Sequence, residues 1–283
     1  MTGFFYIIAS VICSIAIAHL LKLARNKELS IVPILTVNYA VASLISGFQI
    51  EHLDVITDAA PATLVFALFT GALFIINFFL YSFSLHKNGV GVSVAAMRLS
   101  LVLPVLVSLF WYKEFLNSVN YLGIFIVFVA LVLLLPKSQK SNTNRVFSYS
   151  LLLLFFLNGL VDVLLKIYDR EFTSALPKEA FLALIFSSAF ILGLSYMALK
   201  GRVKFSRKHL FYGVLVGIVN LYSSYFILLA LEMLEGALVF SLTNILNVLL
   251  GTLLGIFYWK DLLSRTQIFG LIAAIIAIIL LII

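Results

Sequence analysis

The segment from Trp111 to Gly123 is repeated, in recognisable form, at residues 258–270. The first copy reads WYKEFLNSVNYLG and the second reads YWKDLLSRTQIFG, and each begins with an aromatic pair, a lysine and an acidic residue. A shorter echo relates the Leu-Leu-Lys sequence ending at Lys22 to the one ending at Lys166. Because both echoes fall at the ends of long apolar runs, the sequence indicates a membrane protein made of two similar halves. That construction is typical of secondary transporters.

The composition requires a lipid environment. The chain is 63% hydrophobic and 11% charged, whereas a soluble domain is about 45–50% apolar and about 25% charged. The net charge of +7 is therefore assigned to loops at a membrane surface and not to a nucleic-acid site. The lone cysteine, Cys13, can form no internal disulfide. No signal peptide is recognised, so the first apolar run is expected to remain as a helix.

Apolar runs of the ~20 residues that a membrane span needs occur ten times along the chain. They are residues 3–21, 31–50, 61–85, 89–111, 116–136, 147–165, 180–199, 210–231, 236–259 and 266–283. We therefore predict an all-α integral membrane protein with ten transmembrane helices.

The longest polar connection, residues 137–146, falls after the fifth predicted span. It divides the chain into a first five-helix repeat at residues 1–136 and a second at residues 147–283. Because five is odd, the second repeat enters the membrane from the opposite face, and the two are predicted to be inverted repeats. Most loop Lys and Arg residues fall in the odd-numbered connections, which places those loops in the cytoplasm and both termini outside.

Each half resembles an EamA-type module of the drug/metabolite transporter superfamily, and the resemblance covers essentially the whole chain. It is carried by the Leu-Leu-Lys end of each first span, the small-residue-rich fourth span, the aromatic-Lys-acid turn and the Gly-containing fifth span. The resemblance implies alternating-access transport of small metabolites or drugs, often export, through a cavity lined by spans one, three, four, six, eight and nine. It also implies cytoplasmic termini, in conflict with the charge distribution.

One departure from the wider superfamily concerns an acidic residue. The resemblance to single-module small multidrug resistance proteins implies an essential carboxylate about two turns before the end of the first span. The matching residues here are Ser14 and Asn158, neither of which can bind a proton and a cation in alternation. Proton-coupled export of lipophilic cations by that mechanism is therefore disfavoured.

The predicted spans contain two formally charged residues, Arg98 in span four and Asp162 in span six. Each costs about 2.5–3.5 kcal/mol to insert, so such residues normally face a bundle interior or a watery cavity. The helical rise places them about 10 Å apart in depth, a spacing that suits a small zwitterion with its carboxylate at Arg98 and its ammonium at Asp162. The alternatives are a water-bridged pair that fixes helix packing, or an Asp162 partnered by Lys166 one turn away.

Uncharged polar residues also occur in the expected cavity spans. The candidates for substrate contact are Asn77, Tyr81, Asn158, Asn220, Ser224, Asn244 and Asn247. The alternative is helix packing, because interhelical hydrogen bonds contribute about 0.6–2 kcal/mol and small residues let helices approach. For the glycines of spans eight and nine we favour packing. His19 and Asp162 are the candidates for coupling to a proton or another ion.

The duplication aligns Ser100 with Asn247 and Pro104 with Gly251. Polar groups and helix-weakening residues at matching positions of two halves point to a binding site near the membrane midplane. We expect Pro104 to kink its helix and free a carbonyl in the preceding turn. Glu114 and Asp261 are interpreted as structural acids at helix N-termini.

The sequence carries no phosphate-binding loop and no His/Cys metal cluster, so we expect no cofactor and no enzymatic activity. The function expected is secondary-active export of a small polar or zwitterionic metabolite, such as an amino acid, across the cell (inner) membrane. The alternative is efflux of hydrophobic drugs or flipping of a lipid-linked sugar. The expected partners are the substrate, the bilayer and a proton or another ion as coupling candidate, with the chain a monomer or a homodimer.

Overall fold

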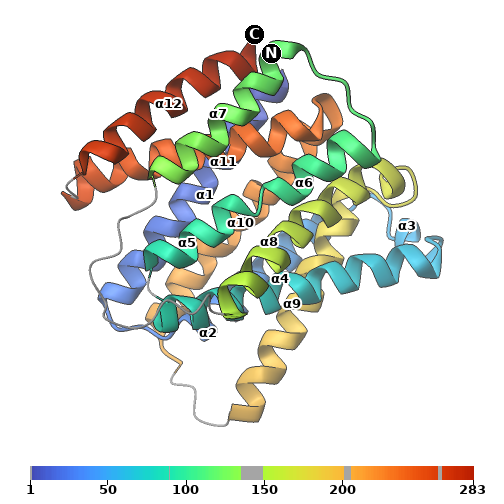
Figure 1. Cartoon of the computed structure of the whole chain (residues 1–283). Coiled ribbons are helices and arrows are strands. Elements are labelled where there is room, and N and C mark those ends of the chain that lie inside the picture. The colour runs from blue at the N-terminus through green and yellow to red at the C-terminus, as the bar shows by residue number, and fades with distance from the viewer. Residues whose placement is uncertain (1, 89, 135–148, 201–204, 261–262) are drawn as a thin grey trace. The chain divides into compact units, whose positions relative to one another are not determined.

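The computed structural model of the chain describes residues 2–88, 90–134, 149–200, 205–260 and 263–283. Within these ranges every regular secondary-structure element is a helix (Figure 1). The α-helices are α1 (Thr2–Asn26), α2 (Ile31–Phe48), α3 (Asp54–Thr57), α4 (Pro61–Asn88), α5 (Val90–Leu99), α6 (Val102–Leu106), α7 (Ser118–Leu134), α8 (Tyr149–Ile167), α9 (Lys178–Lys200), α10 (Arg207–Met233), α11 (Gly236–Leu254) and α12 (Arg265–Ile282). Three π-helical turns, η1 (Val107–Trp111), η2 (Tyr168–Phe172) and η3 (Gly255–Trp259), continue α6, α8 and α11.

Nine helical segments within the described ranges are long and apolar enough to cross a membrane. The predicted span at 116–136 corresponds to α7, an apolar helix of 17 residues. The all-helical, multi-pass membrane character predicted from the sequence is thereby confirmed, while the number ten and the inverted arrangement remain predictions. The predicted linker at 137–146 and Asp261 lie outside the described residues.

The chain forms two compact units that cut across the predicted repeats. Unit 1 comprises Met1–Ile76 and Ile167–Glu232, and unit 2 comprises Asn77–Lys166 and Met233–Ile283. Their boundaries fall within α4, at the end of α8 and at the end of α10. Each unit therefore combines helices from both halves of the sequence.

In unit 1, α2 packs along α9, and α10 packs against α2 through two glycines. A Cβ added at Gly213 would lie 2.5 Å from Val37 Cβ, and one added at Gly217 would lie 2.8 Å from the Asn38 carbonyl oxygen. These glycines therefore serve helix packing, as predicted. In contrast, a Cβ added at Gly251 in α11 would meet nothing within 4 Å, so close packing does not explain that glycine.

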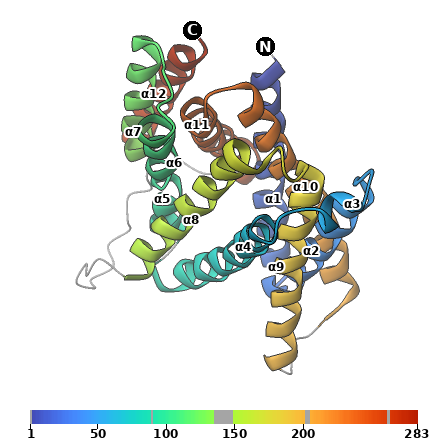
Figure 2. The ribbon, with the colours of Figure 1, turned by 90° about the vertical axis from the view of Figure 1, so that its right-hand side faces the viewer.

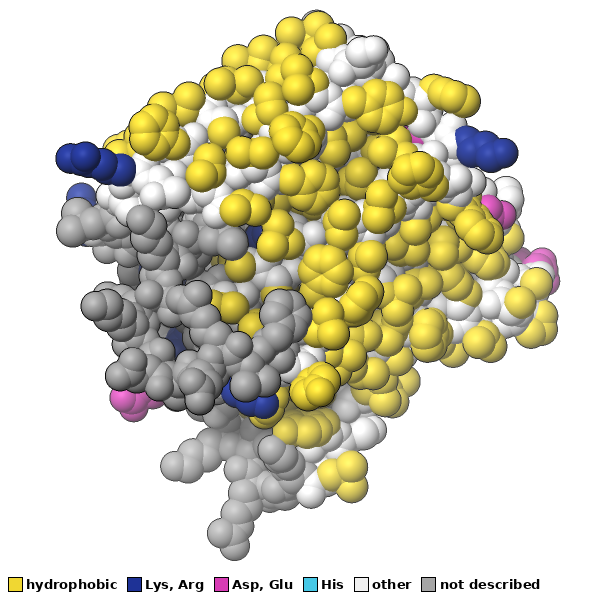
Figure 3. Space-filling view, viewed as in Figure 1, with side chains coloured by type: hydrophobic (Ala, Val, Ile, Leu, Met, Phe, Trp, Pro, Cys, Tyr) yellow, Lys and Arg dark blue, Asp and Glu magenta, His cyan; other side chains and the backbone are white. Residues whose placement is uncertain are grey.

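In unit 2, α7 and α12 lie side by side over much of their length (Figures 1 and 2). The close approach depends on Gly123, since a Cβ there would lie 2.9 Å from the Leu281 side chain. α12 begins with a capping box in which Ser264 and Gln267 exchange hydrogen bonds. The outward faces of both helices are apolar, with Phe125 64% and Ile275 50% exposed (Figure 3). Exposed faces of this kind are suited to lipid.

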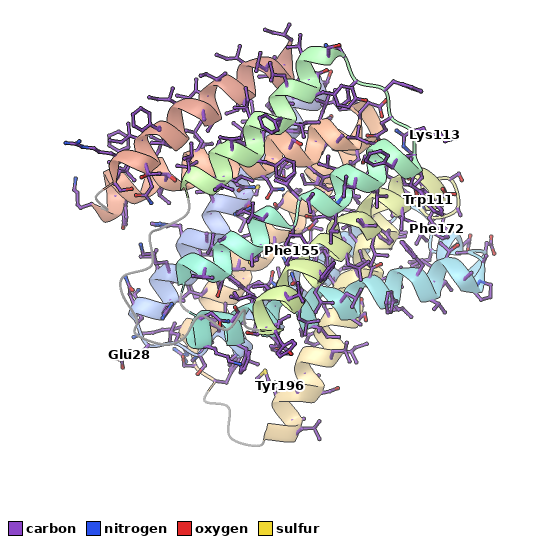
Figure 4. All side chains as sticks on the ribbon, in the orientation of Figure 1. Glu28, Trp111, Lys113, Phe155, Phe172 and Tyr196 are labelled. Carbon is purple, nitrogen blue, oxygen red and sulfur yellow. The ribbon has the colours of Figure 1, made fainter. Side chains whose placement is uncertain are left out.

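The two copies of the repeated motif share an unusual backbone geometry. In each copy a π-helical turn, η1 or η3, ends the helix. A lysine in the left-handed conformation follows, with φ of 52° at Lys113 and 60° at Lys260; Lys113 is seen beyond Trp111 in Figure 4. Positive φ is uncommon outside glycine. The similarity between the two copies therefore extends from sequence to local conformation.

Candidate functional site

The helix that carries Arg98 is interrupted just after it. α5 ends at Leu99 and α6 begins at Val102. In a continuous helix the N–H of residue 104 would bond to the Ser100 carbonyl, but Pro104 has no N–H. The Ser100 carbonyl instead accepts from the Leu103 N–H at 3.0 Å. The helix is thus interrupted close to Pro104, whereas the prediction that a carbonyl is left free is wrong.

Asn158 of α8 binds directly to this interruption. Its amide nitrogen donates to Ser100 Oγ at 2.7 Å and to the Met97 carbonyl at 3.3 Å. Its oxygen accepts a hydrogen bond from Asn77 Nδ2 of α4 at 3.1 Å. Two predicted substrate contacts, Asn77 and Asn158, are thus brought together. Their mutual bond joins α4 to α8, and the bond from Asn158 to the Met97 carbonyl joins α8 to the end of α5.

Gly159 allows α8 to come this close. A Cβ at residue 159 would lie 2.7 Å from the Ser100 carbonyl oxygen and 2.6 Å from Leu103 Cδ1. Because the first of these neighbours is backbone, it has little freedom to move away. A glycine beside Asn158 is therefore what places the Asn158 amide against the interrupted helix.

The two formal charges of the predicted spans also lie within electrostatic range of each other. Arg98 lies in the last turn of α5, where a cation interacts favourably with the helix dipole. Its guanidinium interacts electrostatically with the side chains of Asp162 and Tyr81. Tyr81 lies one helical turn beyond Asn77 on α4, and Asp162 lies one turn beyond Asn158 on α8. We refer to Asn77, Tyr81, Arg98, Ser100, Asn158 and Asp162 as the break cluster.

One polar atom of the break cluster is left without a bond. The Asn77 side-chain oxygen is buried and has no hydrogen-bond partner among the described residues. A buried acceptor without a partner costs about 1–3 kcal/mol. It is therefore a position at which a donor from a ligand would be accommodated favourably.

Asn244 and Asn247 of α11 differ in how their side chains are satisfied. Asn244 donates to the Phe240 carbonyl of its own helix at 3.0 Å, so its amide is engaged locally. The Asn247 side-chain oxygen and Thr243 Oγ1, one turn apart, are buried without hydrogen-bond partners in the described part of the chain. Asn247 and Thr243 are thus better candidates for ligand contact than Asn244.

The remaining predicted site residues, His19, Asn220 and Ser224, belong to unit 1. Asn220 of α10 donates to Asn38 Oδ1 of α2 at 3.1 Å, and Asn38 is 1% exposed. Sequence reasoning missed Asn38 because it considered polar residues only in the spans expected to line a cavity. A lone asparagine in an apolar run was the signal that would have identified it. Ser224 is buried in α10 and His19 is half-buried in α1.

A buried ion pair of unit 2 lies at the end of α8. Lys166 Nζ is 2.9 Å from Glu114 Oε1, and the side chains are 0% and 1% exposed. The Glu114 carboxylate also accepts from the backbone N–H groups of Gly236 and Ala237, each at 3.0 Å. Glu114 therefore caps α11. The sequence had suggested instead that it caps α7, the helix that follows it in the chain. Burial raises the pKa of Glu114, but bonds from Lys166 and from those two N–H groups outweigh it and lower the pKa to about 2.

The comparison with known proteins gives one relative over nearly the full length. A protein of Haemophilus influenzae, described as an uncharacterized protein, is 30% identical over 283 residues, covering 96% of this chain and 95% of its own. The chain belongs to the family of this Haemophilus influenzae protein. No protein-family model matches the chain.

A crystal structure of a protein has a TM-score of 0.79 to this chain and 12% sequence identity, covering 99% of this chain and 96% of its own. At 12% sequence identity, this structural similarity shows only that the two chains share a fold.

The break cluster combines the groups needed to hold a small polar molecule. It has a guanidinium group in Arg98, a carboxyl group in Asp162 and an unsatisfied amide oxygen in Asn77. Asn158 of the cluster bonds directly to the interruption between α5 and α6. The cluster thus brings charged, amide and hydroxyl groups together within unit 2.

Proposed function

We propose that this family member is a secondary-active transporter, and that the break cluster forms part of its binding site for a small polar or zwitterionic metabolite such as an amino acid. The proposal includes the inverted five-helix repeats, membership of the EamA-type transporters, export by alternating access and a location in the cell membrane. The observation that carries it is the bonding of Asn77 and Asn158 at an interrupted helix that has Arg98 in its last turn.

Arg98 and Asp162 lie within membrane spans, where charged side chains are energetically unfavourable. Arg and Asp within a span cost several kcal/mol and persist mainly where they mark a substrate or ion path. A pair that served packing alone would be replaceable by apolar residues, often with a gain in stability. The surrounding interruption adds to the case, since broken helices are the usual places where transporters bind polar substrates.

The pairing also limits which substrates fit. A zwitterion brings one group for each charge, its carboxylate to Arg98 and its ammonium to Asp162. Arg98 has planar guanidinium geometry that matches a carboxylate. The donors of an ammonium group would also satisfy the unpartnered Asn77 oxygen. Anions or cations alone would leave one member of the charged pair without a partner.

The test is thermal stabilisation of the purified protein by a panel of amino acids and other metabolites, followed by flux in liposomes. A ligand at 100 times its dissociation constant stabilises a protein by about 2.7 kcal/mol. We expect zwitterions to raise the melting temperature of the wild type, and Arg98→Met to abolish the shift. Lys113→Met removes an exposed positive charge outside the cluster and should keep the full response.

A double variant separates binding from packing. Arg98→Met with Asp162→Asn removes both charges, so no buried charge is left alone. It should fold with near wild-type stability and still fail to respond to zwitterions or to carry flux. If the double variant keeps the response, or the wild type responds only to hydrophobic compounds, the break cluster is structural and the drug or lipid alternative is favoured.

A further inference from the structure

The ends of three helical segments meet at a single carboxylate in unit 2. Glu114 follows η1, Lys166 lies in the last turn of α8, and Gly236 begins α11. Both oxygens of Glu114 are engaged, Oε1 by Lys166 and the Gly236 N–H, and Oε2 by the Ala237 N–H. This one side chain therefore ties together the ends of three helical segments that are distant in sequence.

The same three segments carry the candidate binding groups. The segment that ends in η1 begins with α5 and Arg98, and α8 carries Asn158 and Asp162. α11 carries Asn247 with its unpartnered oxygen. On α8, Asn158, Asp162 and Lys166 are spaced four residues apart and so share one face of the helix. A shift of α8 in response to a ligand at Asp162 would therefore be transmitted directly to Lys166.

The contacts of Glu114 with Lys166 and α11 favour two discrete arrangements, one fully closed and one fully open. A buried ion pair is stable only while its hydrogen bonds are complete, and removing one partner costs about 3–5 kcal/mol. An arrangement in which the Glu114–Lys166 pair is only partly separated is therefore unfavourable, whereas full separation hydrates both charges. The closed arrangement also leaves Ser108 Oγ buried without a hydrogen-bond partner in the described ranges, which lowers its stability.

We propose that Glu114, Lys166 and the first residues of α11 form a releasable latch. The latch closes one end of the helices around the break cluster and opens during each transport cycle. The inference rests on the proposed transport function, and it adds a conformational step at residues that contact no substrate. Glu114 and Lys166 are accordingly positioning residues.

The structure supplies a way to lock the latch. A Cβ added at Gly236 would lie 2.6 Å from Ser108 Oγ, and its other close neighbours are Cε and Cδ of Lys166. Cysteines at these two positions therefore approach disulfide geometry. In a Cys13→Ser background, Ser108→Cys with Gly236→Cys should form a bond that joins η1 to α11.

A matched cross-link serves as the control. In the α7–α12 pair, a Cβ at Gly123 would lie 2.9 Å from Leu281 Cγ, so Gly123→Cys with Leu281→Cys should also oxidise. That pair lies on α7 and α12, which contain none of the latch residues. We expect oxidation of the latch pair to reduce flux at least tenfold, with recovery on reduction and with ligand binding retained. Oxidation of the control pair should change flux less than twofold.

The outcomes for the latch and for the transport function are distinguishable. If the wild type shows neither flux nor ligand response, the proposed function fails. If the wild type carries flux and the variant with the oxidised latch pair carries the same flux, the latch proposal is wrong.

A labelling experiment tests the latch without any substrate. Ser108 is 0% exposed, so Ser108→Cys in the Cys13→Ser background reacts with a membrane-impermeant maleimide only when the latch opens. We expect slow labelling in liposomes, accelerated at least tenfold by Glu114→Gln. Equal rates with and without Glu114→Gln, or no labelling until the protein is denatured, would overturn the proposal.

Discussion

Lys166 Nζ and Glu114 Oε1 lie 2.9 Å apart with both side chains excluded from solvent. Removing one charge leaves the other buried and unpaired, which costs about 3–5 kcal/mol. We therefore expect Lys166→Met to lower the free energy of unfolding by about that amount. Adding Glu114→Gln should recover part of the loss, because the double variant buries no charge. Denaturation of the four proteins of this double-mutant cycle measures the coupling, and simple additivity would contradict it.

The pH dependence of stability should contain a component from Glu114. Its pKa is lowered to about 2 in the folded protein, below the ordinary value of about 4.3 for an unfolded glutamate. The stabilisation is therefore complete above about pH 5 and is lost as the pH falls toward 2. The difference in melting temperature between wild type and Glu114→Gln, followed from pH 6 to pH 2.5, should shrink with acidification. A constant difference would show that the carboxylate does not titrate in this range.

The approach of α8 to the interrupted helix should be sensitive to one methyl group. Gly159→Ala would place a Cβ 2.7 Å from the Ser100 carbonyl oxygen, and overpacking of this kind costs about 1–3 kcal/mol. Gly251→Ala is the matched control, since nothing lies within 4 Å of its added Cβ. The control should be neutral or stabilise α11 by up to about 1 kcal/mol. Equal effects at the two positions would argue against the close approach.

The two left-handed lysines should respond in parallel. Lys113 and Lys260 have φ of 52° and 60°, a conformation that costs an L-residue about 1–2 kcal/mol and glycine almost nothing. Replacing either lysine by glycine should therefore raise the free energy of unfolding by about 1 kcal/mol. Lys208→Gly, in the first turn of α10, should lower it. Chemical denaturation of the single variants compares the three positions.

The amide pair at the centre of the break cluster should show modest coupling. Asn77 Nδ2 donates to Asn158 Oδ1 at 3.1 Å, and interhelical hydrogen bonds within membranes average about 0.6 kcal/mol in double-mutant cycles. Asn158→Ala should cost more than Asn77→Ala, because it also releases Ser100 Oγ and the Met97 carbonyl. A cycle of Asn77→Ala and Asn158→Ala, measured by unfolding, tests both statements.

The helices themselves could be predicted from sequence because lipid imposes a local requirement. Every residue of a span must be compatible with an apolar solvent, so the apolar runs indicate the helices. The interruption after Leu99 was also predictable, since Pro104 lacks the N–H that continues a helix. Both properties are encoded within a few residues of the feature they determine.

The partners of Glu114 could not be predicted in the same way. An acid just before α7 suggested a cap for that helix, whereas the carboxylate binds Lys166 and the N-terminus of α11. Nothing in the sequence near residue 114 distinguishes these helix ends. The meeting of Asn77 with Asn158 was likewise hidden, because each was identified only as a polar residue in an apolar span. Their contact depends on how α4 and α8 pack.

The interleaved composition of the two units bears on how the protein is made. Unit 1 requires Ile167–Glu232 in addition to its first segment, and unit 2 requires Met233–Ile283. A ribosome that has translated only the first half of the chain has therefore released helices that complete neither unit. Unit 1 becomes complete before unit 2, and the helices Asn77–Lys166 must wait in the bilayer for their last partners. The packing of unit 2 therefore cannot be completed until the last helices of the chain have been synthesised.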